Sequence, residues 1–342
     1  MYELTHRQAQ NIVDKMMKDI PYNINIMDKA GIIIGSGNKK RIGTLHPGAV
    51  AAIKQKKIVE IKKDENFVKK GINLPIELNG FIVGVIGISG EVKETSPFGK
   101  LVKSAVILLI EQSVALEKEN LEKNLKQKFF NLITESGTAY TKELMDQALT
   151  YGIQLNKPCQ IVYAEFSTEI AEGTIKNFPF FKTSNHSLCM VIQEPNKVET
   201  LQKQIRNNFP DTFISISKIN DKISDGFSQT KSAMRVLKGV FFNKKVISYA
   251  ECEFIAGLSE LQRNDAKVEH LAHLLEKNDE LIKTLQVYLN CNLNINETAS
   301  QLIIHRNTLN YRLNRIYKMT GKNPKNILEL VELIFMLINR IK

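Results

Sequence analysis

Basic and amide side chains gather near the carboxyl-terminal end of this chain. Between residues 303 and 326 there are six basic residues and no acidic one. Residues 281–342 hold nine basic and three acidic residues, so they carry +6 of the formal net charge of +11. Clustered positive charge favours contact with a polyanion such as nucleic acid. Because asparagine can pair with adenine and arginine with guanine through two hydrogen bonds, this segment is predicted to read DNA bases and hold phosphates.

Two short helices, over residues 297–302 and 308–319, are predicted to position these side chains. Their apolar residues recur at helical spacing and fall on inward positions: Ala299, Leu302, Ile304, Leu309, Leu313 and Ile316. Asn296 and Asn307 are the predicted N-caps, because an asparagine side chain accepts hydrogen bonds from unpaired backbone N–H groups. The spacing is that of a helix-turn-helix, although the turn at 303–305 lacks the glycine that is usual there.

The outward face of the second helix carries the predicted DNA contacts. The residues for base edges are Arg306, Asn307, Asn310, Tyr311 and Asn314, and those for phosphates are Arg312, Arg315 and Lys318. His305 and Thr308, at the start of the helix, complete the predicted set. The alternative interpretation is a solvated basic helix on a helical subdomain.

A second group of polar residues lies near the amino-terminal end and suits a small polar anion. An arginine can hold a carboxylate through two parallel N–H donors, while hydroxyl, amide and backbone N–H groups satisfy the remaining oxygens. The predicted ligand-binding residues are Ser36, Gly37, Asn38, Arg41, Ile42, Gly43, His46, Gly48 and Asn73. The alternative roles are structural: the glycines serve turns, His46 caps the helix that begins near Pro47, and Asn73 satisfies a buried backbone group.

The elements that carry this second group are a helix and several strands. An apolar stripe predicts a helix over residues 4–20, ending before Pro21. Strands are predicted at 23–28, 32–35, 58–61, 71–78 and 81–89. Asn79-Gly80 predicts a hairpin turn between the last two, because both residues tolerate positive φ. Residues 1–95 are therefore predicted to form a PAS/Cache-like antiparallel sheet with a helix, a common shape for ligand sensors.

A long helix predicted over residues 101–133 joins this region to a second α+β region. Strands are predicted there at 160–166, 187–193 and 213–217, and helices at 141–151, 198–208 and 227–237. The second region has no glycine-rich phosphate loop, no paired carboxylates at a strand turn and no nucleophile elbow, so no catalytic residue is predicted. The last 60 residues are helical in pattern, which makes the predicted fold class α+β and multidomain.

Length and composition narrow the classes of protein to which this chain can belong. A chain of 342 residues is long enough for two or three domains of roughly 100 to 200 residues each. Its 43% apolar and 24% charged residues are typical of globular proteins. The four cysteines lack metal-binding spacing, so no metal or cofactor is expected. The amino terminus lacks the apolar segment of a signal peptide, and no apolar run approaches the ~20 residues that span a bilayer. We therefore expect a cytoplasmic protein without a membrane partner.

The motifs at both ends resemble those of one family of regulators. ETASQLIIHRNTLNYRLNRIYKMTG (297–321) closely resembles the C-terminal helix-turn-helix of PucR-type and sugar diacid regulator (CdaR-type) transcription factors, in which the turn reads hydrophobic-His-Arg-Asn-Thr. NINIMDKAGIIIGSGNKKRIGTLHPGA (23–49), with GINLPI (71–76) and GVIGISGE (84–91), is similar to their sugar diacid recognition domain. The middle of the chain corresponds to the family's degenerate cyclase-like domain, whose Gly-Gly-acidic signature has no counterpart here.

The resemblance implies three parts: a sensor domain with its linker helix at 1–133, a degenerate cyclase-like domain at 134–262 and a helix-turn-helix domain at 263–342. It implies a ligand-responsive activator of genes for the catabolism of a small hydroxy acid, such as glycerate or an aldarate, with double-stranded DNA as partner. A homodimer or higher homo-oligomer is expected, because helix-turn-helix proteins commonly bind two half-sites. Two alternatives remain: a nucleotide cyclase or phosphodiesterase in the middle domain, and an RNA-binding antiterminator.

Overall fold

The computed structural model describes residues 3–64, 68–78, 80–170, 175, 177–261, 266–275 and 278–341. The chain forms two compact units, residues 1–124 and 125–342. Each unit combines a five-stranded sheet with helices, which confirms the predicted α+β class. Among the described helices, none is long and apolar enough to cross a membrane.

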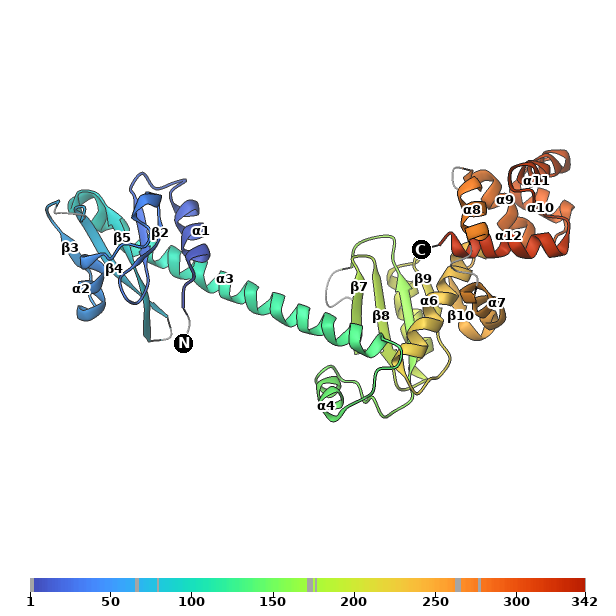
Figure 1. Ribbon diagram of the computed structural model, residues 1–342, viewed down its shortest axis with the longest axis horizontal. Helices are drawn as coiled ribbons and strands as arrows, with labels where there is room; N and C mark the ends of the chain where they lie inside the picture. Colours follow the sequence, from blue (N-terminus) through green and yellow to red (C-terminus); the bar gives the residue numbers. More distant parts are fainter. Residues whose placement is uncertain are drawn as a thin grey trace. The chain divides into compact units, whose positions relative to one another are not determined.

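The first unit is built on an antiparallel sheet with the strand order β2-β1-β5-β4-β3. Its strands are β1 (Ile24–Met27), β2 (Ile33–Ser36), β3 (Val59–Ile61), β4 (Gly71–Leu78) and β5 (Phe81–Ser89) (Figure 1). All five lie where the sequence predicts strands. Leu78 pairs with Phe81, so two residues connect β4 to β5. Gly80 has a φ of 80°, as its place in this turn requires, whereas the predicted turn residue Asn79 lies outside the described residues.

Helices cover both faces of this sheet. The helices are α1 (His6–Met16), α2 (Pro47–Gln55) and α3 (Val92–Thr134). α1 and the first part of α3 share one apolar cluster with the strands, which includes Val13, Val106 and Ile86. α2 packs on the opposite face, where Ala49 lies in a second cluster with Val85. The two clusters are separate because successive side chains of a strand point to opposite faces.

The long helix α3 begins at Val92 rather than at the predicted Leu101. Pro97 lies within the helix, and a proline there argues against a helix when only the sequence is considered. Two features of the structure lie beside this proline. The Oγ1 atom of Thr95 donates to the carbonyl of Glu91, and a Cβ at Gly99 would lie only 2.6 Å from Cδ1 of Ile72. Packing on the sheet therefore accompanies a helical turn that the sequence pattern alone does not predict.

The second unit contains a mixed sheet with the strand order β10-β9-β6-β8-β7. Its strands are β6 (Gln160–Glu165), β7 (Phe180–Ser184), β8 (Ser187–Ile192), β9 (Phe213–Ile216) and β10 (Val246–Ser248). β10 runs parallel to β9, and the other neighbours are antiparallel. The sequence predicts the three central strands and misses β7 and β10. These two are edge strands that are partly exposed, so their apolar alternation is weak.

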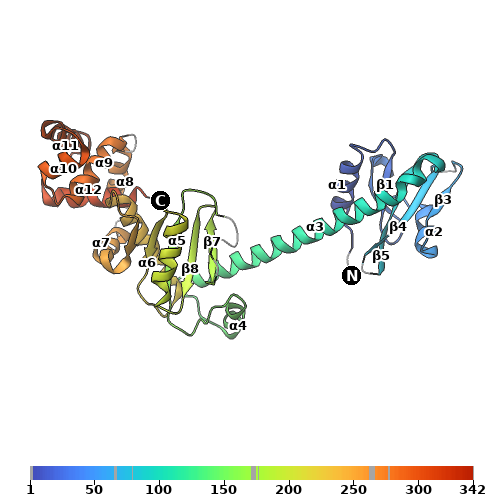
Figure 2. The same cartoon turned by 180° about the vertical axis from the view of Figure 1, so that it is seen from behind.

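Helices also lie on both faces of the second sheet. The chain around these strands forms four helices: α4 (Lys142–Thr150), α5 (Lys197–Asn208), α6 (Ile223–Val240) and α7 (Tyr249–Leu261). α5 packs on one face through Leu201, in a cluster with Val162 (Figure 2). α6 and the end of α3 pack on the other face, where Phe129 and Leu237 share a cluster with Ile161.

The remaining helices form a subdomain with its own apolar core. They are α8 (Ala266–Leu275), α9 (Asp279–Asn290), α10 (Ile295–Leu302), α11 (Arg306–Thr320) and α12 (Ile327–Asn339). Leu285, Leu309 and Leu333 lie in this core and are fully buried. The Nε2 atom of Gln286, on α9, donates to the last carbonyls of α6, those of Lys238 at 3.1 Å and Gly239 at 2.8 Å. The helical subdomain is thus joined to the second sheet through α6.

Candidate functional site

The helix-turn-helix consists of α10 and α11, and its inner face is buried as predicted. Leu309, Leu313 and Ile316 are at most 1% exposed, and Ala299 on α10 is 5% exposed. Leu302 and Ile304 are partly buried against the same core. Because three buried residues of α11 lie at a spacing of three and four, the opposite side of this helix must face outward.

Both predicted N-caps of these helices are wrong. α10 is capped by Asn294, whose Oδ1 accepts hydrogen bonds from the N–H groups of Asn296 and Glu297 at 3.0 and 3.1 Å. α11 is capped by His305, whose Nδ1 accepts from the N–H of Asn307 at 3.3 Å. The helices begin earlier than their apolar periodicity indicates, and capping hydrogen bonds hold the first backbone N–H groups of each helix.

The turn between the two helices contains a strained residue. Ile303 has a φ of 57° and a ψ of 47°, in the left-handed region that glycine usually occupies. Its side chain is 91% exposed, so little apolar burial offsets this conformation. The turn is closed by backbone hydrogen bonds, in which the N–H of Ile304 donates to the carbonyl of Ala299 at 3.0 Å. The missing glycine is therefore replaced by a β-branched residue in the same geometry.

Replacing Ile303 with glycine is expected to stabilise the protein by about 1 kcal/mol. The left-handed conformation costs an L-residue roughly 1–2 kcal/mol, and glycine removes this cost. Part of the gain in stability is lost because glycine has more conformational freedom in the unfolded chain. The free energy of unfolding in urea measures the effect. Ile303→Val keeps the β-branch and should leave stability unchanged. A loss of stability in Ile303→Gly would show that the isoleucine side chain makes a stabilising contact.

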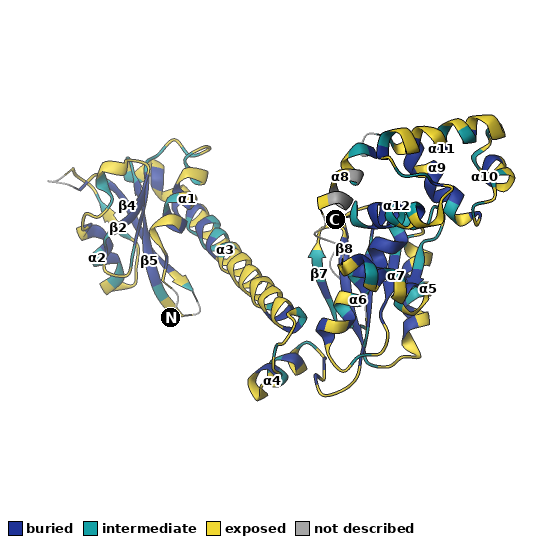
Figure 3. Cartoon of the chain, turned by 45° about the vertical axis from the view of Figure 1, so that its right-hand side comes forward, coloured by how far each residue is buried: buried dark blue, intermediate teal, exposed yellow. Residues whose placement is uncertain are grey.

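The predicted DNA-contacting residues divide into an exposed set and a paired set. The exposed set is His305, Arg306, Asn307, Thr308, Tyr311, Asn314, Arg315 and Lys318 (Figure 3). Two predicted residues are only partly exposed and have partners within the protein. Arg312 forms an ion pair with Glu280 of α9 and donates to Oγ1 of Thr284 at 3.4 Å. Asn310 accepts a hydrogen bond from Nζ of Lys325 at 2.8 Å. Arg312 therefore links α11 to α9 in this structure, away from the exposed set.

In the first unit, polar residues form a row across the sheet on the face that α2 covers. Ser36 pairs with Asn25, Asn25 with Gly87, and Gly87 with Asn73. We call Ser36, Asn25 and Asn73 the polar row; all three are at most 2% exposed. The Oγ atom of Ser36 donates to Oδ1 of Asn25 at 2.6 Å and accepts from the N–H of Asn38 at 3.0 Å. The row therefore fixes the start of the loop that carries Arg41.

Asn73 is the member of the polar row with an unmet hydrogen-bonding group. Its Oδ1 atom is buried and has no hydrogen-bond partner among the described residues. Its amide packs against the first turn of α2, because a Cβ at Gly48 would lie 2.6 Å from Nδ2 of Asn73. A buried acceptor without a partner is costly and uncommon in folded proteins, so Asn73 marks a place where a ligand donor could bind.

His46 caps α2 and lies beside this amide. Its Nδ1 accepts a hydrogen bond from the N–H of Ala49 at 3.3 Å, and its Cε1 would lie 3.2 Å from a Cβ at Gly48. Burial, with a further contribution from the positive charge of Arg41, lowers the pKa of His46 to about 4. The ring is therefore neutral near pH 7. Because Nδ1 accepts, the ring hydrogen belongs on Nε2, which makes no hydrogen bond to a described residue.

The other predicted ligand residues have structural positions. Asn38 caps the short 3-10 helix Lys39–Arg41, and Arg41 is partly buried, which lowers its pKa. Gly43 occupies an exposed turn with a φ of 84°. A Cβ at Gly37 would lie 2.4 Å from Sδ of Met17, so this glycine permits close packing below α1. Ile42 is partly exposed. The structure thus brings His46, Gly48 and Asn73 together, with Arg41 close enough to act on His46 electrostatically.

Sequence reasoning missed Asn25. A signal for it was present, because a single asparagine between Ile24 and Ile26 interrupts an apolar strand. Only the register of β1 with β2 and β5 puts it in line with Ser36 and Asn73.

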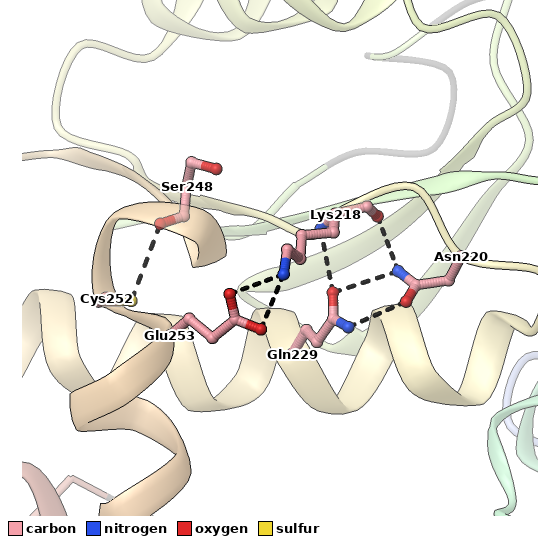
Figure 4. Close-up of polar contacts among 6 residues, drawn as sticks. All are labelled: Lys218, Asn220, Gln229, Ser248, Cys252 and Glu253. Atoms are coloured by element: carbon pink, nitrogen blue, oxygen red, sulfur yellow. Dashed lines mark hydrogen bonds and ion pairs between the residues drawn. The ribbon is translucent and has the colours of Figure 1, made fainter.

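A polar cluster in the second unit has a structural explanation. Nζ of Lys218 donates to both oxygens of Glu253, on α7, at 2.6 and 2.8 Å (Figure 4). Oδ1 of Asn220 accepts from Gln229, on α6, at 2.9 Å. These contacts tie the end of β9 to α6 and α7, and the only carboxylate of the cluster is neutralised by the lysine. Among the described residues, no group of three or more His, Cys, Asp or Glu side chains is placed to hold a metal ion.

Comparison with known proteins gives matches for both parts of the chain that hold a candidate site. The family model described as sugar diacid recognition matches residues 4–133, and that of the PucR C-terminal helix-turn-helix domain matches residues 281–338. The carbohydrate diacid regulator of Escherichia coli is 30% identical, over 95% of each chain. This chain belongs to the carbohydrate diacid regulator family. It is therefore a transcriptional regulator with a helix-turn-helix, and not an enzyme.

Two further proteins are similar to this chain of the carbohydrate diacid regulator family. An uncharacterized protein of Haemophilus influenzae is 31% identical over 93% of this chain and 94% of its own length. The purine catabolism regulatory protein of Bacillus subtilis is 23% identical over 65% of this chain and 51% of its own length. The family membership confirms the resemblance of both ends of the chain, and it removes the cyclase or phosphodiesterase alternative.

Proposed function

We propose that this regulator binds double-stranded DNA through α11 and that a small hydroxy acid or sugar diacid, bound by the first unit, changes that binding. The exposed set on α11 carries the proposal. Arg306, Asn307 and Asn314 offer the donors and acceptors that read base edges, while Arg315 and Lys318 offer positive charge to phosphates. Arg312 was predicted to hold a phosphate, but we propose a structural role for it instead. Through its ion pair with Glu280 it fixes the angle between α11 and α9.

The DNA-binding proposal distinguishes base contacts from phosphate contacts. Arg306→Ala should cost about 1–3 kcal/mol of binding free energy on the cognate operator and little on unrelated duplexes. Arg315→Ala should weaken binding to every duplex and lower the slope of log affinity against log salt by about one unit. Fluorescence anisotropy with operator and scrambled duplexes, at several salt concentrations, measures both effects.

A control variant is measured in the same anisotropy titrations. Lys322→Ala removes a positive charge that is paired with Glu332, and it should change neither sequence preference nor the salt slope. Equal losses on all duplexes from Arg306→Ala and Arg315→Ala would contradict the assigned roles. Tighter binding to single-stranded RNA than to duplex DNA at equal salt would favour an antiterminator. Sedimentation velocity of the operator complex gives the number of chains bound, for which we propose two or a higher multiple.

The proposed effector site is in the first unit, with Arg41, His46 and Asn73 as its central residues. Arg41 supplies the positive charge, His46 a neutral donor and Asn73 an acceptor. The name of the Escherichia coli relative, carbohydrate diacid regulator, supports an aldarate as effector. A hydroxy acid with one carboxylate, such as glycerate, is the other effector that we propose. We further propose that the regulator activates genes for catabolism of this effector, in the cytoplasm.

We propose three functional parts: a sensor with its linker helix at 1–133, a degenerate cyclase-like domain at 134–262 and a DNA-binding domain at 263–342. The sheet of the first part supports a PAS/Cache-like assignment. α3 is the proposed link between sensor and second sheet, because its end packs through Phe130 against Phe181 and Phe227. An effector can change DNA binding only if it binds two conformations of the regulator with different affinities. A coupling free energy of about 1–3 kcal/mol between effector binding and DNA binding would change the DNA affinity by roughly 5- to 150-fold.

A further inference from the structure

The first part of α3 carries a row of apolar side chains on its exposed side. We call Phe98, Leu101, Ala105 and Leu108 the α3 stripe. Leu101 is 70% exposed and Leu108 is 66% exposed, whereas other residues of this helix, such as Val106, are buried against the sheet. Monomeric proteins seldom leave a continuous row of large apolar side chains in water. The α3 stripe therefore marks an interaction surface.

The spacing of the α3 stripe is that of paired helices. Its members are separated by three, four and three residues, so the first and third take a positions and the second and fourth take d positions of a heptad repeat. Between residues 95 and 110 the only charged residues are Lys100 and Lys103, and both fall outside these positions. The a and d positions of this segment thus form an uncharged seam, which suits packing against another helix with the same repeat.

Two hollows follow the line where α1 and α3 lie side by side. The one beside the α3 stripe has a volume of about 320 Å³, and its lining includes Leu101 and Ala105 together with Met16, Ile20 and Tyr22. The second, of about 310 Å³, lies between α1 and residues 109–116 of α3. One surface therefore offers both protruding side chains and hollows. In a two-fold symmetric pair each copy presents this same surface, so the side chains of one copy can enter the hollows of the other.

The a position that follows the α3 stripe indicates the direction of the pairing. It is Gln112, which is exposed. A glutamine amide both donates and accepts hydrogen bonds, so Gln112 can bond to its counterpart when two helices are parallel and in register. In an antiparallel pair centred on the stripe, the amide would lie opposite the apolar end of the other stripe and lose that partner. A polar a residue of this kind favours one register.

We propose that two copies of this chain pair through the α3 stripe, with their α3 helices parallel and in register. The inference rests on the proposed binding of two or more copies to one operator, and it deepens that proposal by naming the surface through which they meet. Leu101 and Leu108 of each copy face the same residues of the other and are removed from water. The contact lies within the first unit, so the pair forms without DNA.

Sedimentation velocity of the full chain without DNA tests the pairing. The wild-type chain should be a dimer at micromolar concentration. Leu101→Glu should weaken the dimer at least about 30-fold, because it places a charge at the centre of the contact in both copies. Its circular dichroism spectrum should stay that of the wild type, since Leu101 is exposed within one chain. Leu149→Glu makes the same change at a leucine of α4 that is 57% exposed, and it should leave the dimer intact.

A monomeric wild-type chain, or equal dimer affinities in the wild type and Leu101→Glu, would overturn the inference. The operator titrations measure the proposed function separately. A dimer that ignores every operator duplex would contradict DNA binding and leave the pairing standing, whereas a monomer that binds its operator would do the reverse.

Engineered cysteines test the parallel register. Leu101→Cys and Leu108→Cys should each form a disulfide between two copies when copper phenanthroline is added as oxidant, because equal d positions face each other in a parallel pair. Lys100→Cys lies outside the seam and should not form one. The four native cysteines are buried, so the wild type should give no linked dimer on a non-reducing gel. A disulfide at only one of positions 101 and 108, or at neither, would overturn the parallel pairing.

Discussion

Leu313→Ala is expected to destabilise the helical subdomain by about 2–5 kcal/mol and to abolish operator binding at ordinary protein concentrations. Leu313 is 1% exposed and lies in the core shared by α9, α11 and α12. Removing three buried carbon atoms leaves a cavity beneath the helix that presents the exposed set. A loss of this size is a large fraction of the 5–15 kcal/mol that typically holds a domain together, so α11 would no longer be held in position.

The matched control for this substitution is Leu328→Ala. Leu328 is 80% exposed at the start of α12, so the same change should alter stability by no more than about 0.5 kcal/mol and leave operator binding intact. Urea unfolding measures stability, and fluorescence anisotropy measures operator binding. Acid binding by the first unit should persist in both variants. Wild-type operator affinity in Leu313→Ala would contradict the assignment of α11 as the DNA-binding helix on this core.

Gly239→Ala is expected to loosen the joint between α6 and the helical subdomain and to destabilise the second unit by about 1–3 kcal/mol. A Cβ at Gly239 would lie 2.6 Å from the carbonyl oxygen of Leu337 and 2.9 Å from Cα of Ile338. These are backbone atoms of α12, so a side chain cannot rotate away and one helix must move. The hydrogen bonds from Gln286 to Lys238 and Gly239 would be disturbed by the same shift.

Gly257→Ala provides a control of opposite sign. Gly257 lies within α7, and a Cβ there would meet nothing within 4 Å. Alanine should therefore stabilise α7 by about 1 kcal/mol through its higher helix propensity. Urea unfolding compares the two variants, and operator titrations with and without the acid measure the coupling. Gly239→Ala should also reduce the effect of the acid on operator binding. If both substitutions stabilised the protein, the close contact at Gly239 would not exist in solution.

Local sequence patterns predicted most of the elements. The apolar residues at 23–28 and 32–35 predicted the strands β1 and β2, and the spacing of Leu309, Leu313 and Ile316 predicted the buried face of α11. These predictions succeed because the period of a strand or a helix is recorded in neighbouring residues. Predictions were less accurate at element ends, where single hydrogen bonds decide, as the caps at Asn294 and His305 illustrate.

The sequence by itself determined that this chain carries an antiparallel sheet with polar loops at one end and a basic helix-turn-helix at the other. Only the tertiary structure decided which polar groups meet. Sheet register brought Asn25, Gly87 and Asn73 into one row, and packing paired Arg312 with Glu280 instead of leaving it with the exposed set. The physical reason is that pairing partners separated by dozens of residues are selected by the whole fold, whereas periodicity reports only which face of its own element a residue occupies.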